Sequence, residues 1–147
     1  MPYVQIPNLP AAISLNGTEL FEVVQSGVSV RASLGQITTF TGRGIVAGSL
    51  VDAPTIAWDV WKYPIASVTL GGNRTLAFPT GLNPGTYALY VTQPAVGGPY
   101  TLSFAAGYRF PNGAVPALSL TAGAVDILTF TARDSSHMDT VIQRNFA

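Results

Sequence analysis

Hydrophobic and polar residues alternate over short stretches of this chain, and that alternation predicts β-strands. Three such runs lie within residues 65–93, IASVTLGGNRTLAFPTGLNPGTYALYVTQ. The runs are 65–70, 74–78 and 86–93. In the last one Tyr87, Leu89 and Val91 share one face, which is typical of a strand packed on one side. We therefore take this stretch as the centre of a small all-β domain.

Residues that favour turns separate these three runs. Gly71-Gly72-Asn73 tolerates positive φ, so it predicts a tight reversal after the first run. Pro79, which cannot donate a hydrogen bond to a ladder, ends the second. Asn83-Pro84-Gly85 is a strong turn signal before the third. The sequence thus predicts consecutive short strands joined by turns.

Further short runs follow the same pattern to the end of the chain. They lie at 55–60, 100–104, 108–110, 118–120, 125–132 and 138–144. No helical periodicity of useful length appears after Leu50. Many short strands at regular spacing predict a β-sandwich or a jelly-roll-like barrel, which we assign to residues 51–147.

The first twelve residues carry prolines at positions 2, 7 and 10, which exclude a helix and favour an extended arm. Their apolar side chains would waste surface in water, so we expect them to attach to a partner chain. These residues are Tyr3, Val4, Ile6 and Leu9. The alternative is a frayed terminus.

A β-hairpin is predicted next, with strands at 19–25 and 28–32 around Ser26-Gly27. Ser33 and Gln36 have the spacing of a capping box, which predicts a short helix. A lone hairpin is not stable in water, so this module, residues 14–41, must dock on the β-domain or on copies of itself. Its residues Leu20 and Val23 join the arm as predicted attachment residues, in a domain spanning 1–41. The Gly-rich residues 42–50 are the predicted linker.

Composition narrows the possible partners. Charged residues make up only 10% of the 147, with seven basic and seven acidic, so a nucleic-acid partner is not expected. Hydrophobic residues make up 48%, which predicts that some apolar surface is buried between subunits. No apolar run reaches the length of a membrane helix, and the first residues do not resemble a secretory signal. We expect synthesis in a cytoplasm and no membrane insertion.

Groups for catalysis or metal binding are sparse. The chain has no cysteine and one histidine, His137, so no triad or zinc site can be assembled from Cys and His. Asp134 and Asp139 lie near His137 and are a candidate cation site, against the simpler reading of a solvated turn. The other aspartates are scattered, without the spacing of a calcium loop. We therefore predict no catalytic residues, no metal and no cofactor, in a protein that is not an enzyme.

Aromatic residues offer one further candidate site. Trp58, Trp61 and Tyr63 are close in sequence, and on an exposed face they would form a platform on which sugar rings stack. The alternation instead places Trp58 on the same face as Ile56 and Val60, which favours burial. A core or interface role is the preferred interpretation, and a glycan platform is the alternative. The same question applies to Tyr90, Tyr100 and Tyr108.

Two segments resemble virion proteins of tailed bacteriophages. Gly17–Leu20 (GTEL) and Val23–Val28 (VVQSGV) are similar to the hairpin-and-helix element near the start of many phage fibre and appendage proteins. Asn73–Leu76 (NRTL), Pro84–Gln93 (PGTYALYVTQ) and Val125–Phe130 (VDILTF) are similar to a β-domain of phage tail fibres and related structural proteins. The two likenesses occur in order along the chain and together cover most of it.

This resemblance implies a structural protein located in the virion and built as a homotrimer. No long repetitive shaft is present, which favours a short attached protein: a head fibre, a capsid decoration protein or a small tail component. Its expected partners are copies of itself and phage capsid or tail proteins. The alternative function is a receptor-recognition module of a tail fibre that binds host surface glycans through Trp58, Trp61 and Tyr63.

Overall fold

A computed structural model describes residues 20–33 and 46–146 of the chain. The chain divides into two compact units, Met1–Gly44 and Ile45–Ala147, which we describe separately. In the described residues both units contain β-strands, and the one helical piece there is a 3-10 turn, η2 (Pro111–Gly113). The prediction of an all-β protein is confirmed.

The first unit contains the predicted hairpin. Strand β1 (Leu20–Gln25) pairs antiparallel with β2 (Val28–Ser33) across a two-residue loop. Ser26 and Gly27 have φ angles of 51° and 79°, the left-handed values that a tight hairpin turn needs. The predicted short helix after Ser33, like the extended arm at 1–12, lies outside the described residues.

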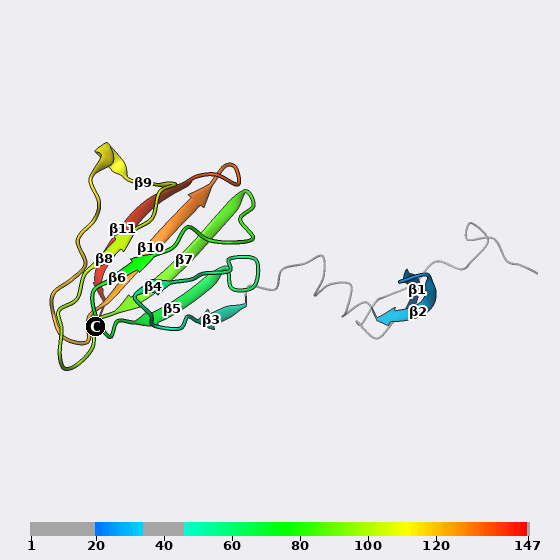
Figure 1. The fold of residues 1–147 in the computed structure, drawn as a ribbon, viewed down its shortest axis with the longest axis horizontal. Helices are drawn as coiled ribbons and strands as arrows, with labels where there is room; N and C mark the ends of the chain where they lie inside the picture. The colour runs from blue at the N-terminus through cyan, green and yellow to red at the C-terminus, as the bar shows by residue number, and fades with distance from the viewer. Residues whose placement is uncertain (1–19, 34–45, 147) are drawn as a thin grey trace, which may run out of the picture. The chain divides into compact units, whose positions relative to one another are not determined.

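The second unit contains two sheets (Figure 1). The larger has six strands in the order β3-β5-β7-β10-β11-β9, and the smaller has three in the order β4-β6-β8. The bounds are β3 (Ala47–Ser49), β4 (Thr55–Ile56), β5 (Ile65–Thr69), β6 (Arg74–Leu76), β7 (Gly85–Thr92), β8 (Leu102–Phe104), β9 (Tyr108–Arg109), β10 (Val125–Ala132) and β11 (Met138–Phe146).

Strands β3 to β8 alternate between the sheets. Odd-numbered strands enter the six-stranded sheet and even-numbered strands the three-stranded one. Within each sheet successive strands of this series pair in parallel. The chain therefore winds as a coil, each turn of which adds one strand to either sheet. In a jelly roll, by contrast, neighbouring strands within each sheet are antiparallel.

The turns of the coil work differently from our expectation. Gly71 and Gly72 do not have positive φ, and they lead the chain from β5 into the other sheet, so that β5 and β6 do not form a hairpin. Gly71 leaves room for a neighbouring side chain. A Cβ on Gly71 would lie 2.7 Å from Oδ2 of Asp52, which is paired with Arg74. Gly85 likewise lacks positive φ, and the left-handed residue near that turn is Gly81, with φ of 69°.

The last strands complete the larger sheet. β10 pairs antiparallel with β7 on one side and β11 on the other, as expected for long alternating strands joined by a polar turn. β9 then pairs in parallel with β11 at the edge. Residues 118–120, predicted as a strand, lie in a loop, and the predicted strand 55–60 shortens to β4.

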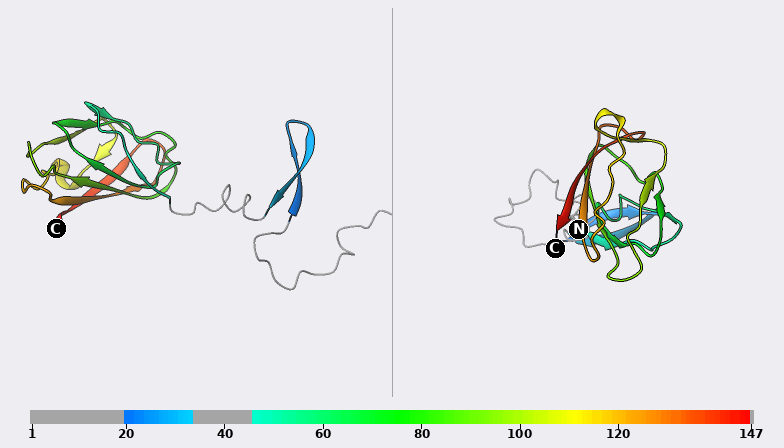
Figure 2. Two further views of the ribbon diagram at one scale, coloured as in Figure 1. Left: turned by 90° about the horizontal axis from the view of Figure 1, so that it is seen from below. Right: turned by 90° about the vertical axis from the view of Figure 1, so that its left-hand side faces the viewer.

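Figure 2 shows the strands of the second unit from two further directions. Buried side chains of both sheets belong to one hydrophobic cluster. Ile56 and Leu76 enter it from the smaller sheet, and Leu89 and Leu128 from the larger, each fully buried.

The strand assignment also corrects the domain boundary. β3, which pairs with β5, lies within residues 42–50 that we predicted to be linker.

Candidate functional site

The outward side chains of the six-stranded sheet form the candidate site, which we call the outer face. Residues paired across neighbouring strands lie in rows on the same side of a sheet. The pairing defines three rows: Ala47, Ile65, Ala88, Thr129 and Val141; Ser49, Ser67, Tyr90, Ile127 and Gln143; and Thr69, Thr92, Val125 and Phe146. None of these residues is buried.

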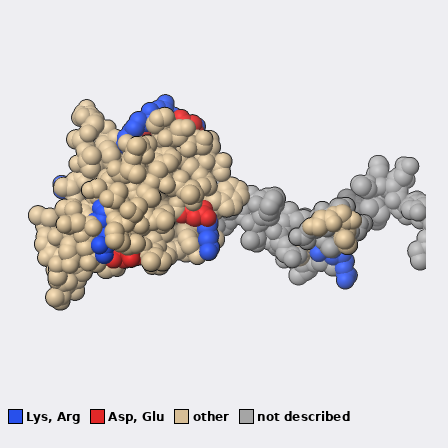
Figure 3. Space-filling view, in the orientation of Figure 1, with Lys and Arg blue, Asp and Glu red and all other residues tan. Residues whose placement is uncertain are grey.

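None of the three rows contains a charged residue. The rows combine apolar side chains with uncharged hydroxyl and amide groups. Several large apolar groups are open to solvent, including Tyr90, Val141 and Phe146, which are 38%, 52% and 46% exposed. Figure 3 shows one side of the second unit, on which the charged residues occupy separated spots. Such a surface suits contact with protein better than contact with an ion or a nucleic acid.

Charged groups occur at one end of the outer face, in a fourth row made by Thr86, Thr131, Asp139 and Arg109. Arg109 Nε lies 3.1 Å from Asp139 Oδ1, and Arg133 Nε lies 3.6 Å from Asp139 Oδ2. Asp139 and Arg109 are each 45% exposed, so this pairing adds little to stability. It does place the charge at the edge of the face.

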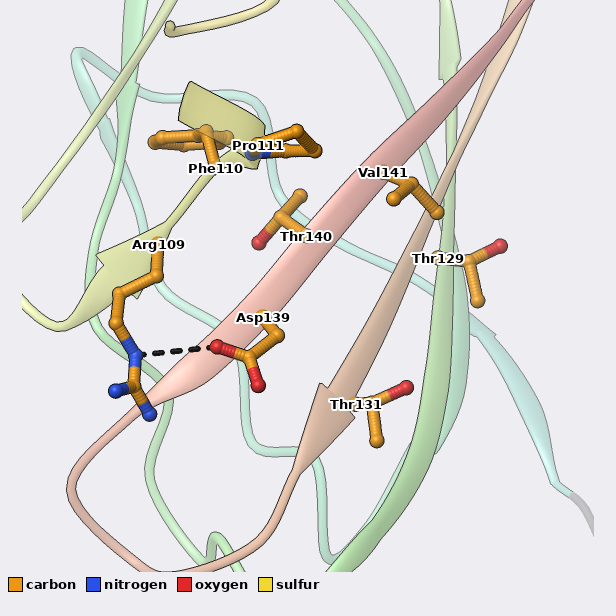
Figure 4. Close-up of a pocket in the computed structure, with 8 residues that line it drawn as sticks. All are labelled: Arg109, Phe110, Pro111, Thr129, Thr131, Asp139, Thr140 and Val141. Carbon is orange, nitrogen blue, oxygen red and sulfur yellow. Dashed lines mark ion pairs between the residues drawn. The ribbon is translucent and has the colours of Figure 1, made fainter. Parts of the chain in front are cut away.

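A hollow of about 340 Å³ lies beside this charged row (Figure 4). Its floor includes the outward residues Thr129, Thr131 and Val141, and Phe110 and Pro111 line it from the segment after β9. The Arg109–Asp139 pair lies at its border. The lining offers hydroxyl groups and apolar surface, without a nucleophile–base pair. This hollow is therefore a depression in the outer face.

Asp126 is a buried carboxylate on the other side of the same sheet, 1% exposed. Its Oδ2 accepts a hydrogen bond from the Ser119 amide at 2.6 Å. Its Oδ1 accepts from Ser119 Oγ at 2.6 Å and from the Asn145 amide at 2.9 Å. These bonds tie the loop before β10 and the end of β11 to the sheet. The carboxylate therefore has a structural role.

Other buried polar groups are likewise satisfied. Gln93 accepts a hydrogen bond from the Tyr100 amide at 2.9 Å and donates one to the Tyr100 carbonyl at 2.7 Å, closing the loop between them. Tyr108 donates its hydroxyl to the Ala77 carbonyl at 2.9 Å, and burial raises the pKa of this phenol. Within the described residues, no buried side-chain polar atom lacks a partner. These groups hold loops and sheets together.

His137 lies in the predicted polar turn between β10 and β11. Asp134 caps this turn, since its Oδ1 accepts hydrogen bonds from the amides of Ser136 and His137 at 2.7 and 3.0 Å. The Ser136 amide bond is the main cause that lowers the pKa of Asp134. Asp139, the other proposed ligand, pairs with arginines. No group of three candidate metal ligands occurs in the part of the chain that the structure describes.

The structure separates the proposed aromatic platform. Trp58 is 1% exposed and packs edge-on against Phe130, with ring centroids 5.3 Å apart, so it is a core residue and not a platform for sugars. The Tyr63 ring is partly buried and covers Gly48 of β3. Trp61 alone of the three is largely open, at 51% exposed. The preference for burial that the alternation indicated at Trp58 is confirmed.

Tyr90, Tyr100 and Tyr108, the other aromatic residues considered for the platform, lie in three different environments. Tyr90 is on the outer face, Tyr108 is buried in the core, and Tyr100 is partly buried against it.

A separate groove of about 520 Å³ lies along the first turn of the coil, with Asp59, Lys62 and Tyr63 among its lining residues. Asp59 accepts hydrogen bonds from the amides of Trp61 and Lys62, which fixes this turn.

The predicted attachment residues of the arm, Tyr3, Val4, Ile6 and Leu9, lie outside the described residues. Leu20 and Val23 lie in β1, where they pair with Ser33 and Val30 of β2.

Sequence reasoning missed the outer face as a site. The sequence did contain a signal for it, in the residue types at the outward positions of 86–93 and 125–132. These residues are small, hydroxylated or apolar, whereas the solvent-facing positions of a sheet usually carry polar or charged residues. Reading that signal across strands required the order and register of the sheet.

Comparisons with known proteins identify no relative. No protein-family model matches the chain, and no curated protein or solved structure matches it significantly. The part of the chain that the structure describes contains no helix with the length and apolar character needed to cross a membrane.

Proposed function

We propose that this chain is a non-enzymatic structural protein of a bacteriophage particle, which works by packing against other proteins. The outer face is the observation that carries the proposal, because its three rows expose apolar side chains without a single charge. The likeness of segments 17–28, 73–93 and 125–130 to phage fibre and appendage proteins supplies the setting.

In this proposal the second unit is a β-sandwich formed by the two sheets, and it presents the outer face to neighbouring proteins of the virion. Residues 1–41 attach the protein to the particle through the apolar arm and the hairpin, and they help it to trimerise. Burial of apolar surface yields about 25 cal/mol for each Å² removed from water, so contact across a sheet face is a sufficient driving force. A trimeric head fibre, capsid decoration protein or small tail component fits this description.

Deletion of residues 1–12 tests the attachment step. The truncated protein should no longer bind particles, while its circular dichroism and thermal unfolding match those of the full chain. Undiminished binding of the truncated protein would contradict attachment through the arm. Labelled protein located on intact particles by electron microscopy would show whether it sits on the capsid, tail or baseplate.

A second candidate function is recognition of a host glycan. The exposure of Trp61, in a turn whose neighbours Asp59 and Lys62 line the 520 Å³ groove, favours it over a purely structural role for this loop. Aromatic surface with adjacent polar groups suits a sugar ring. Specific binding on a glycan array that is lost in Trp61→Ala, with folding unchanged, would support this function. Absence of binding on the array would leave the structural role as the better account.

A further inference from the structure

We propose that the outer face packs against the outer faces of the other copies in the proposed trimer. This inference rests on the proposed function, because it names the partner of the surface on which that function depends. Three properties of the face support a self-contact: its charge, its relief and its size.

The charge of the face favours a copy of itself as partner. When a surface meets the same surface of another copy, any charge on it risks facing a like charge, which is destabilising. The rows through Ala88, Tyr90 and Thr92 contain none, so a self-contact has no such cost. A strongly charged partner would gain no ion pair there.

The relief of the face suits interlocking. Tyr90 projects from β7 with 38% of its surface exposed. Ser67 lies beside it on β5, and Ala88 precedes it by two residues on the same side of β7. A large ring next to two small residues forms a projection beside a depression. Two copies can therefore place a ring of one over the small residues of the other, which increases the contact between them.

The size of the face is just sufficient for a specific contact. The strands β3, β5, β7, β10 and β11 have three, five, eight, eight and nine residues. At about 3.3 Å per residue and about 4.8 Å between strands, the face covers about 520 Å² on each copy. Two such faces in contact would bury about 1,000 Å², which is about the smallest area expected of a specific interface. Arg109 and Asp139 lie at one end, where they would form a polar rim.

Introducing a charge at the centre of the face tests the inference. We compare the full-length chain with Ala88→Lys and with the matched control Ser103→Lys, which alters an exposed outward position of β8 in the other sheet. The wild type and Ser103→Lys should sediment as a multiple of the chain mass over a dilution series. Ala88→Lys should sediment as a single copy, with the circular dichroism of the wild type. A single-copy wild type, or association unaffected by Ala88→Lys, would overturn the inference.

Thiol protection provides a second measurement that does not require Ala88→Lys to fold. Because the chain has no cysteine, Ala88→Cys introduces a unique thiol, and Ser103→Cys provides the control. Maleimide labelling of Ala88→Cys should slow several-fold as protein concentration rises. Labelling of Ser103→Cys should be independent of concentration. Equal behaviour of the two thiols would place the contact elsewhere and contradict the inference.

Binding to particles separates failure of this inference from failure of the proposed function. A single-copy wild type that still binds particles, and loses binding in Ala88→Lys, would show that another virion protein covers the face. The inference would then be wrong and the proposed function would stand. A chain that self-associates through the outer face but is absent from particles would support this inference and contradict the proposed function.

Discussion

The two faces of the six-stranded sheet use the same strands for different purposes. On β7, Tyr87, Leu89 and Val91 point inward and are at most 1% exposed, while Ala88 and Tyr90 between them point outward. The inner face is large, apolar and closed by the three-stranded sheet. Three of the four rows of the outer face carry no charge, and we propose that other chains cover it. Substitutions on the inner face should therefore change stability, and those on the outer face should change assembly.

Truncation of neighbouring residues on β10 should show the largest contrast. Leu128 is fully buried, so Leu128→Ala should lower the free energy of unfolding by about 3 kcal/mol through lost burial and the cavity left behind. Ile127 faces outward, and Ile127→Ala should cost less than about 1 kcal/mol. Urea unfolding at low protein concentration measures both. Equal losses would mean that the outer face is already part of a folded core.

Neutralising two aspartates extends the contrast to polar groups. Asp126→Asn should lower the free energy of unfolding by about 2 kcal/mol, because an amide cannot accept all three hydrogen bonds that the buried carboxylate accepts. Asp139→Asn on the outer side should change it by less than about 0.5 kcal/mol. Thermal unfolding of both variants gives the comparison. A small effect at Asp126 would show that the network is dispensable.

Removing single hydroxyl groups should give a smaller difference. Tyr108→Phe loses the hydrogen bond to the Ala77 carbonyl in the core, with an expected cost of about 1 kcal/mol. Tyr90→Phe on the outer face keeps the ring and should leave stability unchanged, within about 0.5 kcal/mol. Chemical unfolding curves that coincide for the two variants would contradict the assignment of Tyr108 to the core.

The smallest expected effect is a dependence on acid. Arg74 hydrogen-bonds Asp52 through Nε–Oδ1 at 2.9 Å and Nη2–Oδ2 at 2.6 Å, which lowers the pKa of Asp52. The unfolded state therefore takes up a proton at higher pH than the folded state. The contribution is present above about pH 4 and is lost as the pH falls through the lowered value. Asp52→Asn should flatten this part of the stability–pH profile, and an unchanged profile would contradict it.

The sequence by itself determined the local features. The left-handed pair Ser26-Gly27 forms its hairpin, the alternation at 125–132 becomes β10 with the same bounds, and Trp58 is buried on the face that the pattern indicated. These outcomes depend on backbone conformations and side-chain alternation, which act over a few residues.

Only the tertiary structure decided which strands are neighbours. Residues near Gly71 were expected to reverse the chain, yet they lead from one sheet to the other, so that β5 pairs with β7 and not with β6. The outer face arises from that pairing, since it gathers Ile65, Ala88 and Thr129 from separate parts of the chain into one row. Local propensity carries no information on long-range pairing, because a strand is stabilised by whichever edge and core become available to it.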